Sequence, residues 1–498
     1  MHTPLLRVTA LAALLTCAPL LCAATPSLVQ ALKNGDRTKA LELSRQHDEA
    51  VATEADGTTA LHWAAYHDDL PLIRRLLQAG AKVNVVNDYG STPLSEAAER
   101  ADPESLRLLL AAGADVESPN ADGQTALMTV ARTDVVEAAQ VLVAHGANVN
   151  ASEKWRGQTA LMWACAQSRP AMVRFLIAHG ALVNARSTVR EWPRRVTAEP
   201  RPQNRPLGGL TPLLFAAREG CAACAAELIK AHADLEMADP EGITPLVMSI
   251  LNAQFDTAAV LIKAGANVNT WDMWGRAPLY SAVDYNTTPR GGRPDRPSSD
   301  RTTALDVIDM LLQRGANPDM QLKLFPPYRS LGQDRGGDGM LTVGTTPLLR
   351  AAKAGDSASM RLLLAHGAKA DLPNSLGITP LMAAAGIGST TIDIRARFRN
   401  EQKCIAAAKL LLAAGVDVNA TNNNGQTALH GAAQAGWNGF VQLLADHGAA
   451  INAKDHFGST PLDVAQGKVG FSGRPGVGGG GEVHKDTAAL LAKLATRS

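Results

Sequence analysis

Two cysteines three positions apart have the spacing that thiol chemistry requires. Cys221 and Cys224 enclose two alanines at the predicted start of a helix. A helix N-terminus lowers the pKa of a thiol and favours the reactive thiolate, so the pair could support thiol–disulfide exchange or bind a metal. However, no thioredoxin-like strand pattern precedes the pair, and Cys224 occupies an apolar core position. We therefore favour a structural role and keep redox chemistry as the alternative.

Two further sequence patterns contain some, but not all, of the features that a ligand site needs. The run at 476–481 contains the spacing G-x-G-x-x-G, but a dinucleotide site also needs a preceding strand within a βαβ unit. A Gly-Arg-Pro sequence precedes it instead, which indicates a flexible linker. Four histidines share the sequence A-H-G or D-H-G and suit the dipole at a helix C-terminus: His145, His179, His366 and His447. Without convergent ligands, an HExxH sequence or a P-loop, the sequence predicts no enzyme, no cofactor and no metal.

The elements that position these residues repeat along the chain. A unit of 33 residues begins at a glycine, as in G-T-T-A-L-H-W-A-A from Gly57. Its Thr suits the N-cap of a first helix, a following Pro suits the first turn, and paired alanines let neighbouring helices approach. A second helix with a leucine run ends at a glycine, for which His232 substitutes once, so we expect a strained left-handed backbone there. The marker glycines are Gly57, Gly90, Gly123, Gly157, Gly209, Gly242, Gly275, Gly344, Gly377, Gly425 and Gly458.

This pattern resembles the ankyrin repeat family over residues 27–498. A period near 33 with a T-P-L-H-x-A core is typical of that family. The resemblance implies an all-α solenoid of about twelve helix-turn-helix units with β-hairpin connections and capping units. It also implies protein partners, bound through the hairpins and a concave face, and no catalysis. The blocks 280–284 and 381–386, each followed by an insertion, are similar to exported bacterial members of the family.

The repeats divide the chain into four parts. We expect a signal peptide at 1–24, an N-terminal capping unit at 25–56, ankyrin repeats at 57–457 and a C-terminal capping repeat at 458–498 with a Gly-rich insertion. Stretched intervals between marker glycines place insertions in the repeats at 187–208, 286–301, 319–343 and 387–403. Long insertions confined to one part of a solenoid are commonly functional.

The first residues have the pattern of an export signal. Arg7 supplies a positive charge, Val8–Leu21 forms an apolar run, and small residues at 22–24 suit cleavage before Thr25. We expect the mature chain to be exported from a bacterial cell, and thus periplasmic or secreted. A lipoprotein anchor is less favoured, because no small residue precedes either early cysteine. No later apolar run approaches the roughly 20 residues of a membrane-spanning helix, so we expect no integral membrane segment after cleavage.

Charge and aromatic placement guide the functional prediction. The 48 basic and 47 acidic residues argue against nucleic acid as the main partner. Several Trp, Tyr and Arg residues, types common in binding hot spots, precede marker glycines or end first helices. The candidate protein-binding residues are Tyr66, Tyr89, Arg100, Arg132, Trp155, Arg156, Trp192, Arg218, Trp271 and Trp274. The arginine-rich insertion at 187–208 is interpreted as a solvated loop, with contact to an acidic partner as the alternative.

The sequence therefore predicts an exported scaffold that binds an unidentified protein partner through its hairpins and concave face. Two other hypotheses remain open at this point. One is a redox or accessory protein that uses the pair formed by Cys221 and Cys224. The other is a neutralising partner of a toxin or of a cell-wall enzyme.

Overall fold

The chain forms two compact units, Met1–Asp115 and Val116–Ser498. A computed structural model describes residues 27–192, 205–287, 299–324, 342–387, 400–468 and 483–496, and at Glu191, Trp192, Arg205 and Pro206 it describes the backbone alone. The predicted signal peptide at 1–24 and the glycine-rich run at 476–481 lie outside the described residues, as does most of the predicted insertions. Each unit is built from pairs of antiparallel helices.

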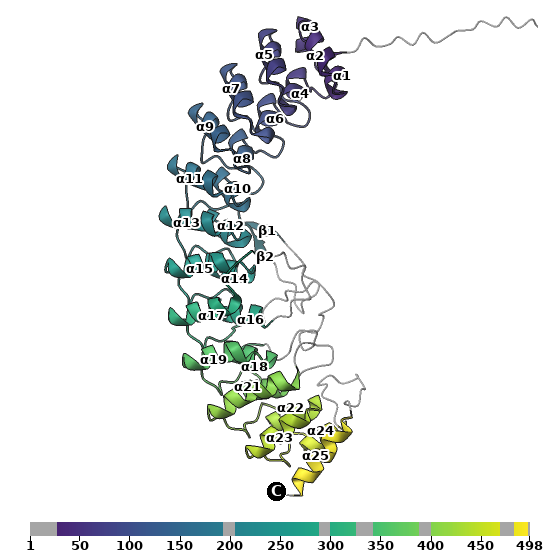
Figure 1. The fold of residues 1–498 in the computed structure, drawn as a ribbon, viewed down its shortest axis with the longest axis vertical. Helices are drawn as coiled ribbons and strands as arrows, with labels where there is room; N and C mark the ends of the chain where they lie inside the picture. The colour runs from purple at the N-terminus through teal and green to yellow at the C-terminus, as the bar shows by residue number, and fades with distance from the viewer. Residues whose placement is uncertain are drawn as a thin grey trace, which may run out of the picture. The chain divides into compact units, whose positions relative to one another are not determined.

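The first unit contains the N-terminal cap and two complete repeats (Figure 1). Its helices are α1 (Leu28–Lys33), α2 (Arg37–Leu43), α3 (His47–Val51), α4 (Ala60–Tyr66), α5 (Leu70–Gln78), α6 (Pro93–Arg100) and α7 (Pro103–Ala111). Helix α4 packs on α6, α5 packs on α7, and α1 packs on both α2 and α4. The cap thus has three short helices where the sequence suggests two, because a turn at 44–46 separates α3 from α2.

In its described residues, the second unit contains nine helix pairs. Its first helices are α8 (Ala126–Val130), α10 (Ala160–Ala166), α12 (Pro212–Glu219), α14 (Pro245–Leu251), α16 (Pro278–Asn286), α18 (Pro347–Ala354), α20 (Pro380–Ala385), α22 (Ala428–Ala435) and α24 (Pro461–Ala465). Its second helices are α9 (Val136–Ala144), α11 (Pro170–Ala178), α13 (Ala222–Lys230), α15 (Phe255–Lys263), α17 (Ala304–Gln313), α19 (Ser357–Ala365), α21 (Glu401–Ala413), α23 (Asn438–Asp446) and α25 (Lys485–Ala495). Each row packs in sequence order and the rows lie side by side (Figure 1). The repeat solenoid predicted from the sequence is confirmed.

Local sequence signals determine where these helices begin and end. Thr92 caps α6 by accepting a hydrogen bond at 3.1 Å from the backbone N–H of Ser95, and Pro93 occupies the first turn. The N-cap residue of α16 is Ala277, so this helix lacks such a side-chain cap. The left-handed backbone predicted at His232 is present, with φ of 61°. Paired alanines such as Ala64 and Ala65 are fully buried, as expected for closely packed first helices.

The connections between repeats differ from the predicted β-hairpins. Among the described residues only β1 (Arg190–Trp192) and β2 (Arg205–Leu207) form a two-stranded antiparallel ribbon. In other described connections an Asx side chain takes the place of a strand ladder. Asn87 Oδ1, for example, accepts from the backbone N–H of Tyr89 at 3.1 Å and of Ser91 at 2.8 Å. The loops are therefore tight turns held by their own side chains.

Neighbouring turns are joined by backbone hydrogen bonds in a fixed register. At five connections the N–H two residues before a marker glycine donates to the C=O one residue before the preceding marker glycine. The pairs are Asp88 to Asp56 at 2.7 Å in the first unit, and Met273 to Glu241 at 2.9 Å, Ser375 to Val343 at 2.9 Å, Asn423 to Leu376 at 3.1 Å and His456 to Asn424 at 2.9 Å in the second. We call the turn that contains the marker glycine of a repeat its loop tip. The hydrogen bond fixes the spacing of the tips that it joins.

Asparagine side chains form a second bridge between repeats. Asn150 Nδ2 donates to Gly180 O at 3.0 Å, and its Oδ1 accepts from Leu182 N at 2.8 Å. Asn269 forms the same two bonds with Gly315 O at 3.0 Å and Asn317 N at 2.8 Å. The valine–asparagine sequence of the repeat thus satisfies a carbonyl left open at the end of the next second helix.

One insertion boundary needs correction. The predicted insertion at 387–403 overlaps α21, which begins at Glu401. Asn400 is its N-cap, because Asn400 Oδ1 accepts from the backbone N–H of Lys403 at 2.9 Å. An Asn followed by Glu is a recognisable helix start, so the last three residues of the predicted insertion belong to the helix.

Two buried histidines make the stability of both units depend on pH. His62 and His430 occupy the same position of α4 and α22 and are buried. His62 Nε2 lies 3.0 Å from Ser91 O, and His430 Nε2 lies 3.1 Å from Ser459 O. In both rings Nδ1 accepts a hydrogen bond from a backbone N–H. These contacts suit a neutral imidazole, and burial lowers the pKa of both histidines.

We predict that mild acid destabilises both units. A histidine with a lowered folded-state pKa binds its proton more readily in the unfolded chain, so the free energy of unfolding falls as the pH drops below about 6.5. Gln at both positions can keep the capping interaction without the proton. The unfolding temperature of the His62→Gln/His430→Gln variant should change less between pH 7.5 and 5.5 than that of the parent chain. Equal changes in the two proteins would contradict the assignment.

Candidate protein-binding surface

Large apolar side chains lie exposed at several loop tips. The exposed fraction is 67% for Tyr89 in the first unit, and 61% for Trp155, 46% for Trp271 and 75% for Phe457 in the second. Exposed rings of this size are costly to leave in water and are frequent at protein interfaces. The placement of Tyr89, Trp155 and Trp271 just before marker glycines agrees with their predicted positions.

The tip at Trp155 is fixed by a buried carboxylate. Glu153 Oε1 accepts from the backbone N–H of Arg156 at 2.7 Å and of Gln158 at 3.1 Å, and the Glu153 side chain is buried. The guanidinium of Arg190 lies 5.8 Å from the centre of the Trp155 ring. A cation at this distance from an aromatic face attracts the ring electrostatically. Trp155 is therefore exposed on a rigid turn beside a basic side chain.

Trp271 has a similar neighbour. Lys323 Nζ lies 3.7 Å from the centre of the Trp271 ring, and both side chains are exposed. Lys323 comes from the described part of the predicted insertion at 319–343. The insertion thus contributes a cation to a tip that belongs to the preceding repeat, and the aromatic and basic side chains form one surface.

The prediction that Trp274 projects from a tip is wrong. Its ring is 1% exposed. Asp272 Oδ1 accepts from the backbone N–H of Trp274 at 3.0 Å, and Asp272 Oδ2 accepts from Arg276 Nε at 2.6 Å. The Arg276 guanidinium lies 4.8 Å from the ring centre. Lys323 N and Leu324 N both donate to Trp274 O, at 2.9 and 3.0 Å, so the enlarged connection lies against this residue.

Three candidate arginines at the ends of first helices lie against aromatic rings of first-helix residues. In the first unit the Arg100 guanidinium lies 4.8 Å from the Tyr66 ring centre, and its Nε donates to Tyr66 O at 2.7 Å. In the second unit Arg132 lies 5.4 Å from the Trp163 ring. Arg218 likewise lies 4.9 Å from the Phe215 ring. The sequence analysis proposed these arginines as binding residues and did not predict their aromatic partners on the first helices.

The remaining two candidates lie at the first enlarged connection. Arg156 is exposed, and its carbonyl accepts from Thr188 N at 2.7 Å. Trp192 belongs to β1, where its backbone is paired with Arg205. Trp163 could have been found from the sequence, because it occupies the same repeat position as Trp63. Arg190 and Lys323 carry no such signal, because both lie in insertions.

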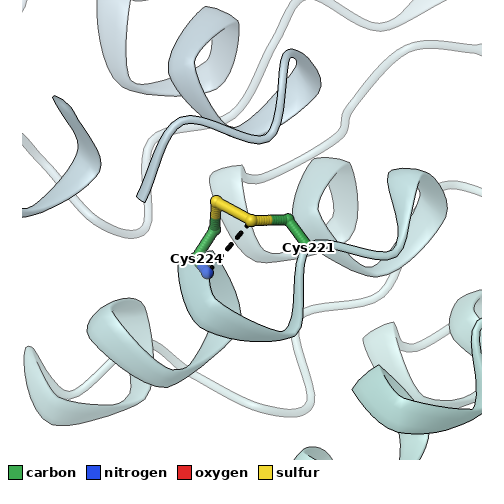
Figure 2. The surroundings of a disulfide bond; sticks show 2 residues. All are labelled: Cys221 and Cys224. Atoms are coloured by element: carbon green, nitrogen blue, oxygen red, sulfur yellow. Dashed lines mark hydrogen bonds between the residues drawn. A yellow bond between two sulfur atoms is a disulfide. The ribbon is translucent and has the colours of Figure 1, made fainter. Parts of the chain in front are cut away.

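The pair formed by Cys221 and Cys224 is a disulfide at the N-terminus of α13 (Figure 2). Cys221 is the N-cap residue, and its Sγ accepts from the Cys224 N–H at 3.1 Å. Cys221 is 7% exposed and Cys224 is fully buried. A reactive dithiol needs an accessible sulfur, so this geometry favours the structural role. Burial also raises the pKa of the Cys165 thiol.

The described residues contain neither a metal-binding cluster nor a membrane-spanning helix. No group of three or more His, Cys, Asp or Glu side chains in the described ranges is placed to hold a metal ion. Among the same residues, no helix has both the length and the apolar character needed to cross a membrane.

The stacked helix pairs with hydrogen-bonded tips define a helical repeat protein. The sequence model of the protein family described as ankyrin repeats (3 copies) matches residues 28–120, 96–187, 196–272, 213–322 and 397–470. The family model of a single ankyrin repeat matches residues 343–375. The chain belongs to the ankyrin repeat family.

Several known proteins share part of this sequence. The chain is 33% identical over 163 residues to the Neurogenic locus Notch protein of Drosophila melanogaster, covering 30% of this chain and 6% of that protein. It is 37% identical over 124 residues to Ankyrin repeat and SOCS box protein 16 of Mus musculus, covering 24% of this chain and 25% of that protein. It is 35% identical over 124 residues to an ankyrin repeat-containing protein of Treponema pallidum (strain Nichols), covering 25% of this chain and 37% of that protein. The chain thus spans well under half the length of these relatives.

A solved structure also matches part of the fold. The ankyrin repeat domain of Bcl-3, described as a member of the IkappaB protein family, is 22% identical to this chain, with a TM-score of 0.39. The match covers 51% of this chain and 99% of that one.

Tryptophan substitutions should separate the exposed surface from the core. Trp274→Ala removes a fully buried ring beside an ion pair and should lower the free energy of unfolding by about 3–5 kcal/mol. Trp155→Ala removes a largely exposed ring, and we expect a change within about 0.5 kcal/mol. Chemical unfolding followed by circular dichroism measures both changes. Similar losses in the two variants would contradict the burial described above.

The disulfide should be replaceable by the polar cap that other repeats use. Asp102 with Ser105, and Asp356 with Ser359, occupy the same two positions of their helices and form the cap without sulfur. We expect Cys221→Asp/Cys224→Ser to fold and to keep partner binding, whereas Cys221→Val/Cys224→Ser loses the cap and about 1 kcal/mol of stability. Loss of binding in the first variant, with its thermal unfolding unchanged, would restore the redox hypothesis.

Proposed function

We propose that this chain is a non-catalytic scaffold that binds a protein partner through the loop tips of its second unit. Members of the ankyrin repeat family typically mediate protein–protein interaction, which supports the general class. The observation that carries the proposal is the exposure of Trp155 and Trp271 on turns that are fixed by hydrogen bonds. A rigid exposed Trp binds with little loss of conformational entropy and is a frequent hot spot.

The fixed register of the tips adds to this argument. Because several turns are bonded to the next, the exposed side chains on them keep their spacing before a partner arrives. Tyr89 in the first unit and Phe457 in the second are likewise exposed over two-thirds or more of their surface. A surface that is ordered in advance requires less reorganisation on binding than a flexible loop.

The proposal predicts that binding and stability respond to different tryptophans. Purified full-length chain should capture its partner from an extract of the producing cells, and Trp155→Ala/Trp271→Ala should weaken that binding by about 2 kcal/mol or more. The control is Phe175→Ala, which changes an aromatic side chain of a second helix. A partner that binds the double variant and the parent chain equally would contradict a role for the tips.

We further propose that the protein acts outside the cytoplasm. The apolar run at Val8–Leu21 with small residues before Thr25 supports export. The disulfide in α13 fits the same hypothesis, because disulfides persist in oxidising compartments. The intact mass of the protein from its native cells should correspond to a chain that begins at or near Thr25. A protein that retains Met1 in that material would contradict export by cleavage.

A further inference from the structure

Exposed cations gather around the two exposed tryptophans of the second unit. Lys154 and Arg156 flank Trp155 and are exposed, and Arg190, which is half-exposed, lies beside the same ring. Lys323 is exposed beside Trp271. We call these residues the basic tip surface: Lys154, Trp155, Arg156, Arg190, Trp271 and Lys323. Among the described residues none of its four cations forms an ion pair.

The carboxylates of the same loops are engaged in holding the turns. Glu153 is buried and accepts backbone N–H groups of its own loop. Asp272 is buried and paired with Arg276. Asp239 accepts from the backbone N–H groups of Glu241 and Ile243, both at 2.9 Å. These three carboxylates therefore point into their turns, and the surface that remains is rich in positive charge.

The loops that carry the basic tip surface are connected to one another. Thr188 N donates to Arg156 O at 2.7 Å, which joins the first two loops. Arg186 Nη1 donates to Ala238 O at 2.8 Å, which joins the second to the third. Met273 N then donates to Glu241 O at 2.9 Å. The tips at Trp155 and Trp271 thus belong to one series of connected loops in the same unit, with the loop at 238–241 between them. A single extended segment can therefore reach several of the six residues.

We infer that the basic tip surface recognises an acidic segment of a protein partner that also carries apolar side chains. This inference rests on the proposed function and specifies the chemistry of the partner. Carboxylates of the segment would pair with the four cations, and its apolar side chains would pack on the two exposed rings. Complementary charge accelerates association and selects between partners. A single-stranded nucleic acid is less favoured, because the chain as a whole carries a formal net charge of only +1.

A selection with random peptides tests the inference with the full chain. A library of displayed 12-residue peptides is selected against the parent protein, and the affinity of enriched peptides is measured for three variants. The first reverses the tip charges: Lys154→Glu, Arg156→Glu, Arg190→Glu and Lys323→Glu. The second removes the rings with Trp155→Ala/Trp271→Ala. The matched control reverses four exposed cations at the second helices: Lys263→Glu, Arg314→Glu, Arg361→Glu and Lys409→Glu.

The inference predicts that enriched peptides are acidic and contain apolar residues. Charge reversal at the tips should weaken their binding at least tenfold, the control should change it less than twofold, and raising the salt should weaken it as well. Neutral peptides that respond to the tryptophan variant alone would overturn the inference and leave the proposed function intact. Peptides that respond to neither tip variant would contradict both. Preferential competition by a 20-residue oligothymidylate would overturn the inference in favour of nucleic acid.

Discussion

Within each unit, one kind of backbone hydrogen bond joins several loop tips to the tips that precede them. Its donor lies two residues before a marker glycine, and its acceptor lies one residue before the preceding marker glycine, as in the bond of 2.9 Å from Met273 N to Glu241 O. The marker glycine permits this geometry because its φ is positive, 82° at Gly275. A side chain on Gly275 would meet Lys323 N at 2.5 Å, so the close approach of the next connection, where Lys323 N donates to Trp274 O, also requires the absence of a Cβ atom.

This constraint explains how exposed rings coexist with a stable repeat stack. The alanine pairs and leucine runs of the helices bury the core, while the turns satisfy their polar groups with each other and with their own Asn, Asp or Glu side chains. The tips therefore need no apolar side chain for their own stability. A ring such as Trp155, with 61% of its surface exposed, is free to serve binding. Trp274 shows the opposite outcome, because a residue pair from the next connection lies against it.

Local signals allowed much of the fold to be predicted. Thr and Pro at the start of α6, paired alanines in its middle and glycine after α7 each specify one feature of a helix pair within a few residues. The features that were missed depend on contacts between distant residues. Lys323 lies far along the chain from Trp274, and no local pattern relates them. Of the predicted β-hairpins, the part of the chain that the structure describes contains the one formed by β1 and β2. At Asn87 the side chain bonds the turn in place of a backbone ladder, and the outcome of that competition is not visible in sequence periodicity. The sequence also left open whether Cys221 and Cys224 are bonded; the turn at the start of α13 brings their Cα atoms to 5.2 Å, a separation that a disulfide spans.

Amide hydrogen exchange in the free full-length chain tests the central claim that the tips are ordered before a partner binds. The relevant N–H groups belong to exposed turns yet donate to neighbouring turns: Thr188, Met273, Ser375, Asn423 and His456. The account predicts that these amides exchange far more slowly than unstructured peptide, at rates close to those of the adjacent helix ends. Exchange at the rate of an unstructured chain, with the helices still protected, would contradict a preformed binding surface.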